Sequence, residues 1–296
     1  MPLPPVASDP TPVPDPRSSA LDLVLPILRC PVCGGELSRA DASLRCPDGH
    51  SFDIARQGYA SLTAGVRPIS GDDAPMVQAR RGLLETGVYA PILAELVRLA
   101  AGPERPPSTV VDAGCGTGYY LAGLIDALPS PRGLGLDSST YALRAAARAH
   151  PRAAAVACDL FGPLPVASAS VDLVLDVFAP RNPEEFRRIL RPGGMLVVTR
   201  PADRHLAQLR RDVEGMVGID PEKEERLEQA LDPFFEATHT VSTEYTARLT
   251  SAEAADLVLM TPSARHLSPD DLDGDAAGAL PTEVDISVLT TAYRPR

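Results

Sequence analysis

The sequence lacks any long apolar run. The apolar segment Leu21–Leu28 is short and interrupted by Pro26, well below the roughly 20 residues that a membrane-spanning helix needs. The stretch before it is not typical of a secretory leader, because Asp9 and Asp15 occupy positions where a leader carries basic residues. We therefore expect a cytoplasmic protein with no membrane segment.

Cysteine and positive charge are also scarce. Five cysteines in 296 residues do not indicate a disulfide framework, so reduced thiols that bind a metal or pack in the core are expected. A formal net charge of −11 excludes a broad basic surface for nucleic acid, since such surfaces attract phosphate through Lys and Arg. The acidic excess is uneven: residues 251–296 hold three arginines and eight acids, whereas residues 26–82 hold seven arginines and six acids. That nearly neutral region can still contact RNA through shape and individual arginines.

Length and composition predict two compact units behind a tail. The chain is 44% hydrophobic, enough for one large α/β domain and a small appended module. Residues 1–20 are rich in proline and poor in large apolar side chains, which predicts a disordered tail. We expect the small module at residues 21–70, a linker helix region at 71–107 and the large domain at 108–296.

A cluster of metal ligands stands near the start of the chain. Cys30 and Cys33 are two residues apart on a glycine-containing turn, and Cys46 and His50 follow after twelve intervening residues. Three thiolates and one imidazole form a closed set, which is typical of structural zinc. Packed cysteines are the plainer interpretation, but the stretch has little apolar mass to fold unaided. Iron is the other metal that this ligand set can hold.

The second half alternates strands and helices, which predicts a parallel sheet covered on both faces. Thr109–Ala113 is the first expected strand, and it runs into a glycine turn, Gly114–Gly118, that lets a cofactor approach the backbone. Later strands are expected to end at Asp137, near a ribose, and at Asp159, near an adenine edge. A fourth strand at Val171–Val177 and a helix, turn and fifth strand within residues 187–198 complete the pattern.

This pattern resembles class I S-adenosylmethionine (SAM)-dependent methyltransferases, which have a Rossmann-like α/β sheet. The similarity covers Val110–Thr199 and includes the Arg-Pro-Gly-Gly turn before the fifth strand. A dinucleotide-binding domain shares the glycine turn, and either NAD binding or a pocket without a ligand is the alternative. The expected SAM-binding residues of the turn and the strand ends are Asp112, Gly114, Gly116, Thr117, Asp137 and Asp159.

Two further segments, 52–59 and 71–91, indicate which family of class I methyltransferases the sequence resembles. They read Phe-Asp-Ile-Ala-Arg-Gln-Gly-Tyr and Gly-Asp-Asp-Ala-Pro-Met-Val-Gln-Ala-Arg-Arg-Gly-Leu-Leu with a following Thr-Gly-Val-Tyr-Ala-Pro. Together with the zinc ligands, they look like the rRNA large-subunit guanine-N1-methyltransferase family, from Leu28 to the C-terminus. Residues 178–183, Phe-Ala-Pro-Arg-Asn-Pro, together with Ala-Arg-Gln-Gly-Tyr at 55–59, resemble the tylosin-resistance branch of that family.

The resemblance implies N1-methylation of a guanine in a hairpin of 23S rRNA that lines the peptide exit tunnel, with macrolide resistance as a consequence. It implies zinc at the four ligands and RNA recognition by the zinc-knuckle module. Cofactor contacts then fall on Tyr89, Gly116, Thr117 and His205, with Tyr89 as an aromatic lid. An ordinary helix aromatic and a capping or surface histidine are the plainer roles of Tyr89 and His205. The family also suggests a homodimer in which two zinc modules form one RNA-binding cleft.

Two residues near the end of the fourth strand are candidates for the acceptor side. Asp176 is the candidate base for the guanine N1 proton, and a structural strand-end aspartate is the alternative. Phe178 is the candidate for stacking on an extruded base, with a core role as its alternative. A small-molecule methyltransferase and a non-catalytic ribosome-binding protein are the competing functions. The zinc module disfavours the first, and the intact glycine turn disfavours the second.

Overall fold

The computed structural model describes residues 19–65, 71–102, 106–213, 216, 218, 226, 229–265 and 280–296. The predicted tail, residues 1–20, lies outside the described residues except for its last two. Ser19 is the N-cap of the first helix, which begins at Ala20.

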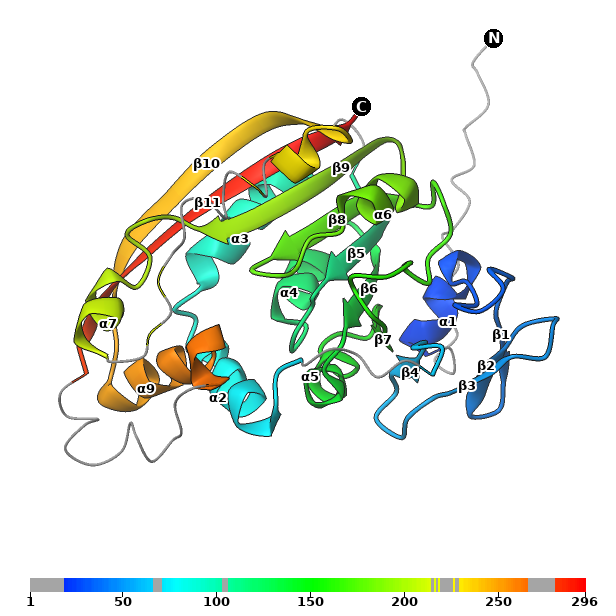
Figure 1. Ribbon diagram of the computed structural model, residues 1–296, viewed down its shortest axis with the longest axis horizontal. Helices are drawn as coiled ribbons and strands as arrows, with labels where there is room; N and C mark the ends of the chain where they lie inside the picture. Colours follow the sequence, from blue (N-terminus) through cyan, green and yellow to red (C-terminus); the bar gives the residue numbers. More distant parts are fainter. Residues whose placement is uncertain are drawn as a thin grey trace, which may run out of the picture.

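One large sheet forms the centre of the molecule (Figure 1). Its strands are β4 (Ala60–Ser61), β5 (Thr109–Ala113), β6 (Arg132–Asp137), β7 (Ala153–Ala157), β8 (Val171–Val177), β9 (Leu190–Pro201), β10 (Phe235–Arg248) and β11 (Glu283–Pro295). A second, three-stranded sheet consists of β1 (Ser38–Ala40), β2 (Ser43–Arg45) and β3 (Ser51–Asp53). The described helices are α1 (Ala20–Val24), α2 (Ala74–Glu85), α3 (Ala90–Ala101), α4 (Tyr119–Ala127), α5 (Thr140–Ala146), α6 (Pro183–Ile189), α7 (Ala207–Asp212) and α9 (Ser251–Leu259), with short 3-10 turns η1 (Leu25–Ile27) and η2 (Pro262–Arg265).

The strand order of the large sheet is β10-β11-β9-β8-β5-β6-β7-β4. The strands from β9 to β4 are parallel, and β11 and β10 join antiparallel at one edge. The chain progresses outward from β5 in both directions, through β6 and β7 on one side and β8 and β9 on the other. Ligands of such sheets bind at this reversal point, beside the carboxyl ends of the central strands. The α/β prediction, with a Rossmann-like sheet, is therefore confirmed.

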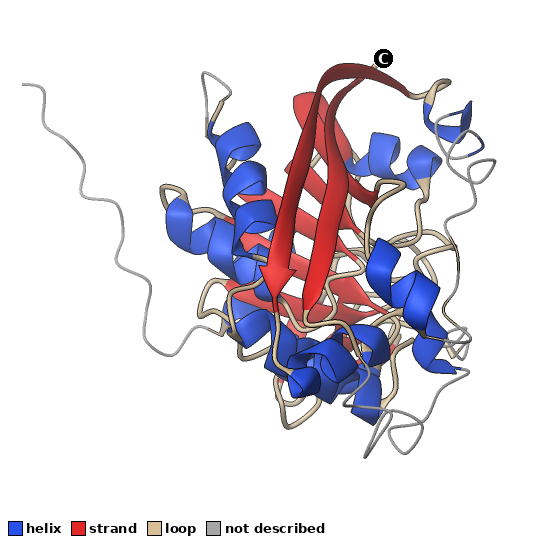
Figure 2. Cartoon of the chain, turned by 90° about the vertical axis from the view of Figure 1, so that its left-hand side faces the viewer, coloured by secondary structure: helices blue, strands red, loops and turns tan. Residues whose placement is uncertain are grey.

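Helices cover both faces of the sheet, as Figure 2 shows. The helices α3 and α4 pack on one face, in a hydrophobic cluster that includes Ile92, Leu124 and Leu173. The opposite face is covered by α1 and α6, in a cluster that includes Val24 and Phe186. Since α2 and α3 contribute buried leucines to the first cluster, the predicted linker helices belong to the packed body.

The N-terminal module is joined directly to the large sheet. Strand β4 pairs in parallel with the edge strand β7, through Ala60 opposite Val156 and Ser61 opposite Ala157. Helix α1 packs on β6 and β7. Leu28, Leu44 and the zinc-ligand candidate Cys46 lie in the same hydrophobic cluster as residues of β5 and β6. The small β1–β3 sheet thus lies at the β4 edge, at the far end from β10 (Figure 1).

The predicted fifth strand is longer than expected. The Arg-Pro-Gly-Gly turn lies inside β9, where Val171 pairs with Leu190 and the next aligned pair is Leu173 with Met195. The extra residues bulge out of the ladder, and Gly193 takes a left-handed φ of 78° there, which glycine adopts readily. Among the described residues, no helix has both the length and the apolar character to cross a membrane.

Candidate active site and metal centre

The four predicted metal ligands converge in the small module. One ligand atom from each of Cys30, Cys33, Cys46 and His50 lies within 4.8 Å of all the others. Two short turns present them: the Gly34 N–H donates to the Cys30 carbonyl at 2.8 Å, and the Gly49 N–H donates to the Cys46 carbonyl at 3.0 Å. Both glycines have left-handed φ angles.

The spacing of the ligand atoms fits zinc. The sulfurs of Cys33 and Cys46 are 3.7 Å apart, and two sulfurs bound to one tetrahedral zinc ion are separated by about 3.8 Å. His50 Nδ1 lies 3.3 Å from the Cys46 sulfur and 3.7 Å from the Cys30 sulfur. These four groups complete the coordination of zinc and leave no position for a substrate, so the site suits a structural ion.

The predicted cofactor turn follows β5. Gly114 and Gly116 have φ angles of 82° and 53°, in the left-handed region that favours glycine. A Cβ on Gly114 would lie 2.4 Å from the Cβ of Ala179. The turn therefore touches the segment that follows β8, in which Phe178 directly precedes Ala179. Thr117, the residue after Gly116 in the turn, is buried.

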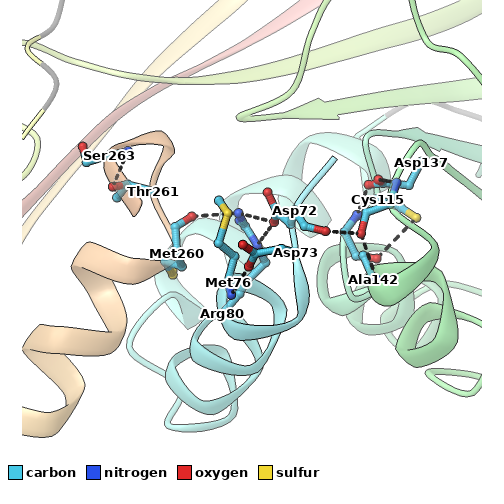
Figure 3. A network of polar contacts seen from close by, with 12 residues as sticks. Asp72, Asp73, Met76, Arg80, Cys115, Asp137, Ala142, Met260, Thr261 and Ser263 are labelled. Atoms are coloured by element: carbon cyan, nitrogen blue, oxygen red, sulfur yellow. Dashed lines mark hydrogen bonds and ion pairs between the residues drawn. The ribbon is translucent and has the colours of Figure 1, made fainter. Parts of the chain in front are cut away.

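Asp137, at the end of β6, organises this turn. One carboxylate oxygen accepts from the Gly116 N–H at 2.8 Å, and the other accepts from the Ser139 N–H at 2.7 Å. Burial raises the pKa of the Asp137 carboxyl, although these two N–H groups oppose that rise. The Ser139 hydroxyl in turn donates to the carbonyl of Asp72 at 2.5 Å, which connects the segment before α2 to the start of α5 (Figure 3).

Asp112 is the most isolated carboxylate of the turn. It is buried, and its Oδ2 has no hydrogen-bond partner among the described residues. Burial, together with the nearby charge of Asp137, raises the pKa of Asp112 to about 7. A cation placed beside it would therefore be bound favourably, because it restores the charged form. The ammonium and sulfonium groups of SAM are cations of this kind.

We expect Asp112→Asn to stabilise the cofactor-free protein above pH 7. The folded state favours the protonated acid, so its stability falls as pH rises from about 4 to about 7, and asparagine does not ionise. A pKa raised to about 7 corresponds to a gain of roughly 4 kcal/mol for the variant at pH 8 and almost nothing at pH 4. Urea unfolding at both pH values measures the gain, with exposed Asp53→Asn as the control. An equal gain at both pH values would contradict the buried-charge explanation.

Three predicted residues form an aromatic cluster beside the turn. The rings of Tyr89 and Phe178 meet edge to face with centroids 6.3 Å apart, and Phe178 stacks on His205 at 5.9 Å. Tyr89 is 1% exposed, so its ring is a buried part of this cluster. Phe178 is a non-glycine residue with a left-handed φ of 55°, a strained conformation of the kind found at functional sites.

His205 is held in its neutral form. Burial and the nearby Arg210 cation lower its pKa to about 4. Its Nδ1 accepts from the Ser287 N–H at 3.3 Å, which places the proton of the neutral ring on Nε2. The ring can therefore offer one N–H donor to a bound molecule.

Asp176 lies beneath the strand end rather than at its surface. It is 0% exposed, and Arg181 Nε is 3.7 Å from its Oδ1. Neither carboxylate oxygen has a hydrogen-bond partner among the described residues. Burial raises its pKa well above the ordinary value, the Arg181 cation opposes this rise and the Asp112 charge adds to it.

Asp159 follows β7, the strand next to β6 in the sheet. Its side chain accepts from the Phe161 N–H at 2.9 Å. The amide of Asn182 donates to the carbonyls of Leu160 and Gly162, both at 3.0 Å. This bonding fixes the loop after β7 against the start of α6.

Sequence reasoning missed two residues at the cofactor turn. Ser139 caps α5, accepting from the Ala142 N–H at 3.2 Å, and a serine before a helical stretch is a recognisable signal for such a cap. Arg80 lies on α2 and reaches the turn from the predicted linker. No sequence spacing indicates that contact, because it depends on how α2 packs on α5 and α9.

Comparisons with known proteins match both halves of the chain. A family model described as RlmA, N-terminal, a zinc ribbon, matches residues 28–63, and a methyltransferase domain model matches residues 110–194. A putative 23S rRNA (guanine-N(1)-)-methyltransferase of Micromonospora griseorubida is 46% identical over 291 residues, covering 92% of this chain and 98% of that protein. The 23S rRNA (guanine(748)-N(1))-methyltransferase of Streptomyces fradiae is 44% identical, with the same two coverages. A trans-aconitate 2-methyltransferase of Azoarcus sp. (strain BH72) is 39% identical over 35% of this chain.

Proposed function

This chain belongs to the 23S rRNA (guanine-N1-)-methyltransferase family, and we propose that it transfers a methyl group from SAM to N1 of a guanine in a 23S rRNA hairpin. The observation that carries the proposal is the contact between Gly114 and Ala179. It supports the proposal because Phe178, which we propose to stack on the base, directly precedes Ala179 in the chain. The two full-length relatives support the substrate class, since each carries this activity in its name.

SAM supplies a methyl group on a positively charged sulfur. The protein's part is to position the acceptor in line and to exclude water, because methyl transfer needs little covalent assistance. Asp137, Gly116 and Thr117 are proposed to hold the cofactor at the carboxyl ends of β5 and β6. Tyr89 and His205 are proposed to bind it from the aromatic cluster, and Asp159 from the strand end of β7.

Phe178 is proposed to stack on the target guanine. Its backbone is fixed by a hydrogen bond from its N–H to the Thr199 carbonyl at 3.0 Å, and its ring is supported by Tyr89 and His205. A base extruded from its helix needs a preformed aromatic surface of this kind.

The guanine N1 proton must leave as the methyl group arrives. Asp176 stays our proposed acceptor in its ionised form, which the Arg181 cation favours and which is a stronger base than an exposed aspartate because burial raises its pKa. Its complete burial means that the strand end must open before guanine can reach it. The structural alternative, in which Asp176 holds Arg181 in place, is supported by their ion pair.

The competing functions are less well supported. Similarity to the trans-aconitate enzyme covers about a third of the chain, whereas the zinc-ribbon match at residues 28–63 is a feature that a small-molecule reaction does not require. A non-catalytic role would permit a degraded cofactor turn, and this one keeps its left-handed glycines.

Purified protein with SAM is expected to place one methyl group on a guanine in a 23S rRNA hairpin fragment. N1 methylation blocks the Watson–Crick edge, so reverse transcription should stop beside the modified base, and mass spectrometry should find 1-methylguanosine. The hairpin with inosine at the target, which keeps N1 but lacks the exocyclic amine, tests whether that amine is read. Methylation of small carboxylic acids with none of rRNA would favour the small-molecule alternative, and SAM binding without any methylation would favour the non-catalytic one.

The relative at 44% identity is the basis of our proposal for the position in the 23S sequence. We propose a guanine equivalent to the 748 in the name of that relative, in the hairpin lining the exit tunnel, with the zinc module contacting the RNA. A cytoplasmic location and resistance to tylosin-type macrolides accompany this proposal. A homodimer with one RNA cleft stays a prediction that light scattering can check.

A further inference from the structure

Arg80 reaches the cofactor turn from a helix that precedes the whole sheet. Its Cδ lies 3.6 Å from the point where a Cβ on Gly116 would stand. Its side chain is 23% exposed. Because Gly116 has no side chain, the arginine stem can lie against the backbone of the turn. The Arg80 cation is also close enough to lower the pKa of Asp137, which binds the same turn.

The guanidinium is held in place by two neighbours (Figure 3). Its Nε and Nη2 lie 3.0 and 2.7 Å from Oδ2 of Asp72, and Nη2 also donates to the Met260 carbonyl at 2.7 Å. Within the described part of the chain, Nη1 makes no hydrogen bond. Arginine carries five N–H donors, so the contacts with Asp72 and Met260 orient the group and leave donors for another acceptor.

The surrounding charges determine what that acceptor can be. Asp112 and Asp137 lie at the same turn, and both have raised pKa values because burial disfavours their charge. A ligand carboxylate placed near them would be repelled, whereas its ammonium or sulfonium group would be attracted. Arg80 already pairs with Asp72 through Nε and Nη2, so Nη1 is the part of this cation that can donate to an anionic group of the ligand.

We propose that Arg80 binds the α-carboxylate of the methionine part of SAM, with Asp72 and the Met260 carbonyl holding its guanidinium in position. This inference rests on the proposed function for the identity of the cofactor. The carboxylate accepts from Nη1, while the ammonium group faces Asp112. Planar guanidinium groups suit this pairing because their donors match carboxylate geometry.

The pairing also explains why α2 belongs to the cofactor site. Arg80 connects α2 to the end of α9 through Met260, and Asp72 connects the start of α2 to α5 through Ser139. A ligand that binds Arg80 therefore stabilises the contact of α2 with the turn. The matched control is the adjacent Arg81, which is 65% exposed and pairs with Glu85 on the outer face of the same helix.

The test measures binding of two ligands by calorimetry without RNA: SAM, and its decarboxylated analogue, which lacks only the carboxylate. Arg80→Ala is expected to weaken SAM binding by roughly ten- to thirtyfold, as loss of a hydrogen bond to a charged group does. The affinity of Arg80→Ala for the decarboxylated analogue should stay within about twofold of the affinity of the unsubstituted protein for that analogue. Arg80→Lys should recover part of the SAM affinity, and Arg81→Ala should leave both affinities unchanged.

Three outcomes would overturn the proposal. Equal loss for both ligands would make Arg80 a structural residue of α2, and no loss for either would place the carboxylate elsewhere. A carboxylate-dependent loss in Arg181→Ala but not in Arg80→Ala would assign the anion to Arg181. Zinc content and circular dichroism confirm that each variant is folded. Because no RNA is present, failure of rRNA methylation would overturn the proposed function and leave this result standing.

Discussion

Cys46→Ser is expected to release zinc and unfold the β1–β3 module. Structural zinc contributes about 10 kcal/mol or more to the folding of small zinc-binding peptides, and serine is a poor ligand for zinc at neutral pH. The loss should be local in its main effect, because the four ligands lie in the small module and the cofactor turn lies at the carboxyl ends of β5 and β6. SAM affinity is therefore expected to change by less than about threefold, whereas binding of the rRNA hairpin should be lost.

The measurement combines zinc content, amide hydrogen exchange in β1–β3 and calorimetry with SAM. Cys158→Ala is the control, because Cys158 is also buried but lies outside the ligand cluster. This variant should keep its zinc, and amide hydrogens in β1–β3 should still exchange slowly. Cys46 shares a hydrophobic cluster with residues of β5 and β6. Unfolding of the small module therefore has a direct route to the cofactor turn, and the expected separation of the two effects can fail. A loss of SAM binding as large as the loss of RNA binding would show that the two halves fold as one unit.

Asp137→Ala is expected to weaken SAM binding by roughly ten- to a hundredfold. The substitution removes the acceptor for the N–H groups of Gly116 and Ser139 and the proposed acceptor for the ribose hydroxyls. Leaving buried donors unpaired costs about 1–3 kcal/mol each. Asp137→Asn keeps one oxygen and should retain more of the affinity than alanine does.

A deoxyribose analogue separates the two roles of Asp137. S-adenosylhomocysteine lacking a ribose hydroxyl should bind the parent protein more weakly and should bind Asp137→Ala with little further loss. Full additivity of the two changes would mean that Asp137 supports the turn and does not touch the ribose. Calorimetry at one pH near 7 gives all four affinities.

The strands around the cofactor turn could be predicted from sequence because their signals are local. β5 and β8 have the predicted bounds, Thr109–Ala113 and Val171–Val177, since each is a short apolar run ended by a turn. The zinc ligands could equally be predicted from sequence, because the spacing of the cysteines and the histidine indicates which side chains can bind one ion. Both features depend on a few neighbouring residues and little on the rest of the fold.

The remaining features depend on contacts between distant segments. Arg80 and Met260 are 180 residues apart, and no periodicity in α2 marks Arg80 as different from Arg81. The burial of Asp176 was likewise hidden, because an aspartate at a strand end has the same sequence signature whether it faces a pocket or the core. The two-residue strand β4 is too short to give an alternating pattern, and it forms only where β7 offers its edge.

The two-residue strand β4 determines how a shortened version of this protein would behave. An uncovered edge of a parallel sheet presents free N–H and C=O groups to other chains and promotes aggregation. Here β4 occupies the edge of β7, with α1 packed beside it. A fragment that starts after residue 70, chosen to isolate the methyltransferase, would expose that edge together with the apolar surface beneath α1. The N-terminal region is therefore expected to keep the methyltransferase part soluble as well as to provide the metal site. A fragment without it would lose the metal site and the cover over the β7 edge together.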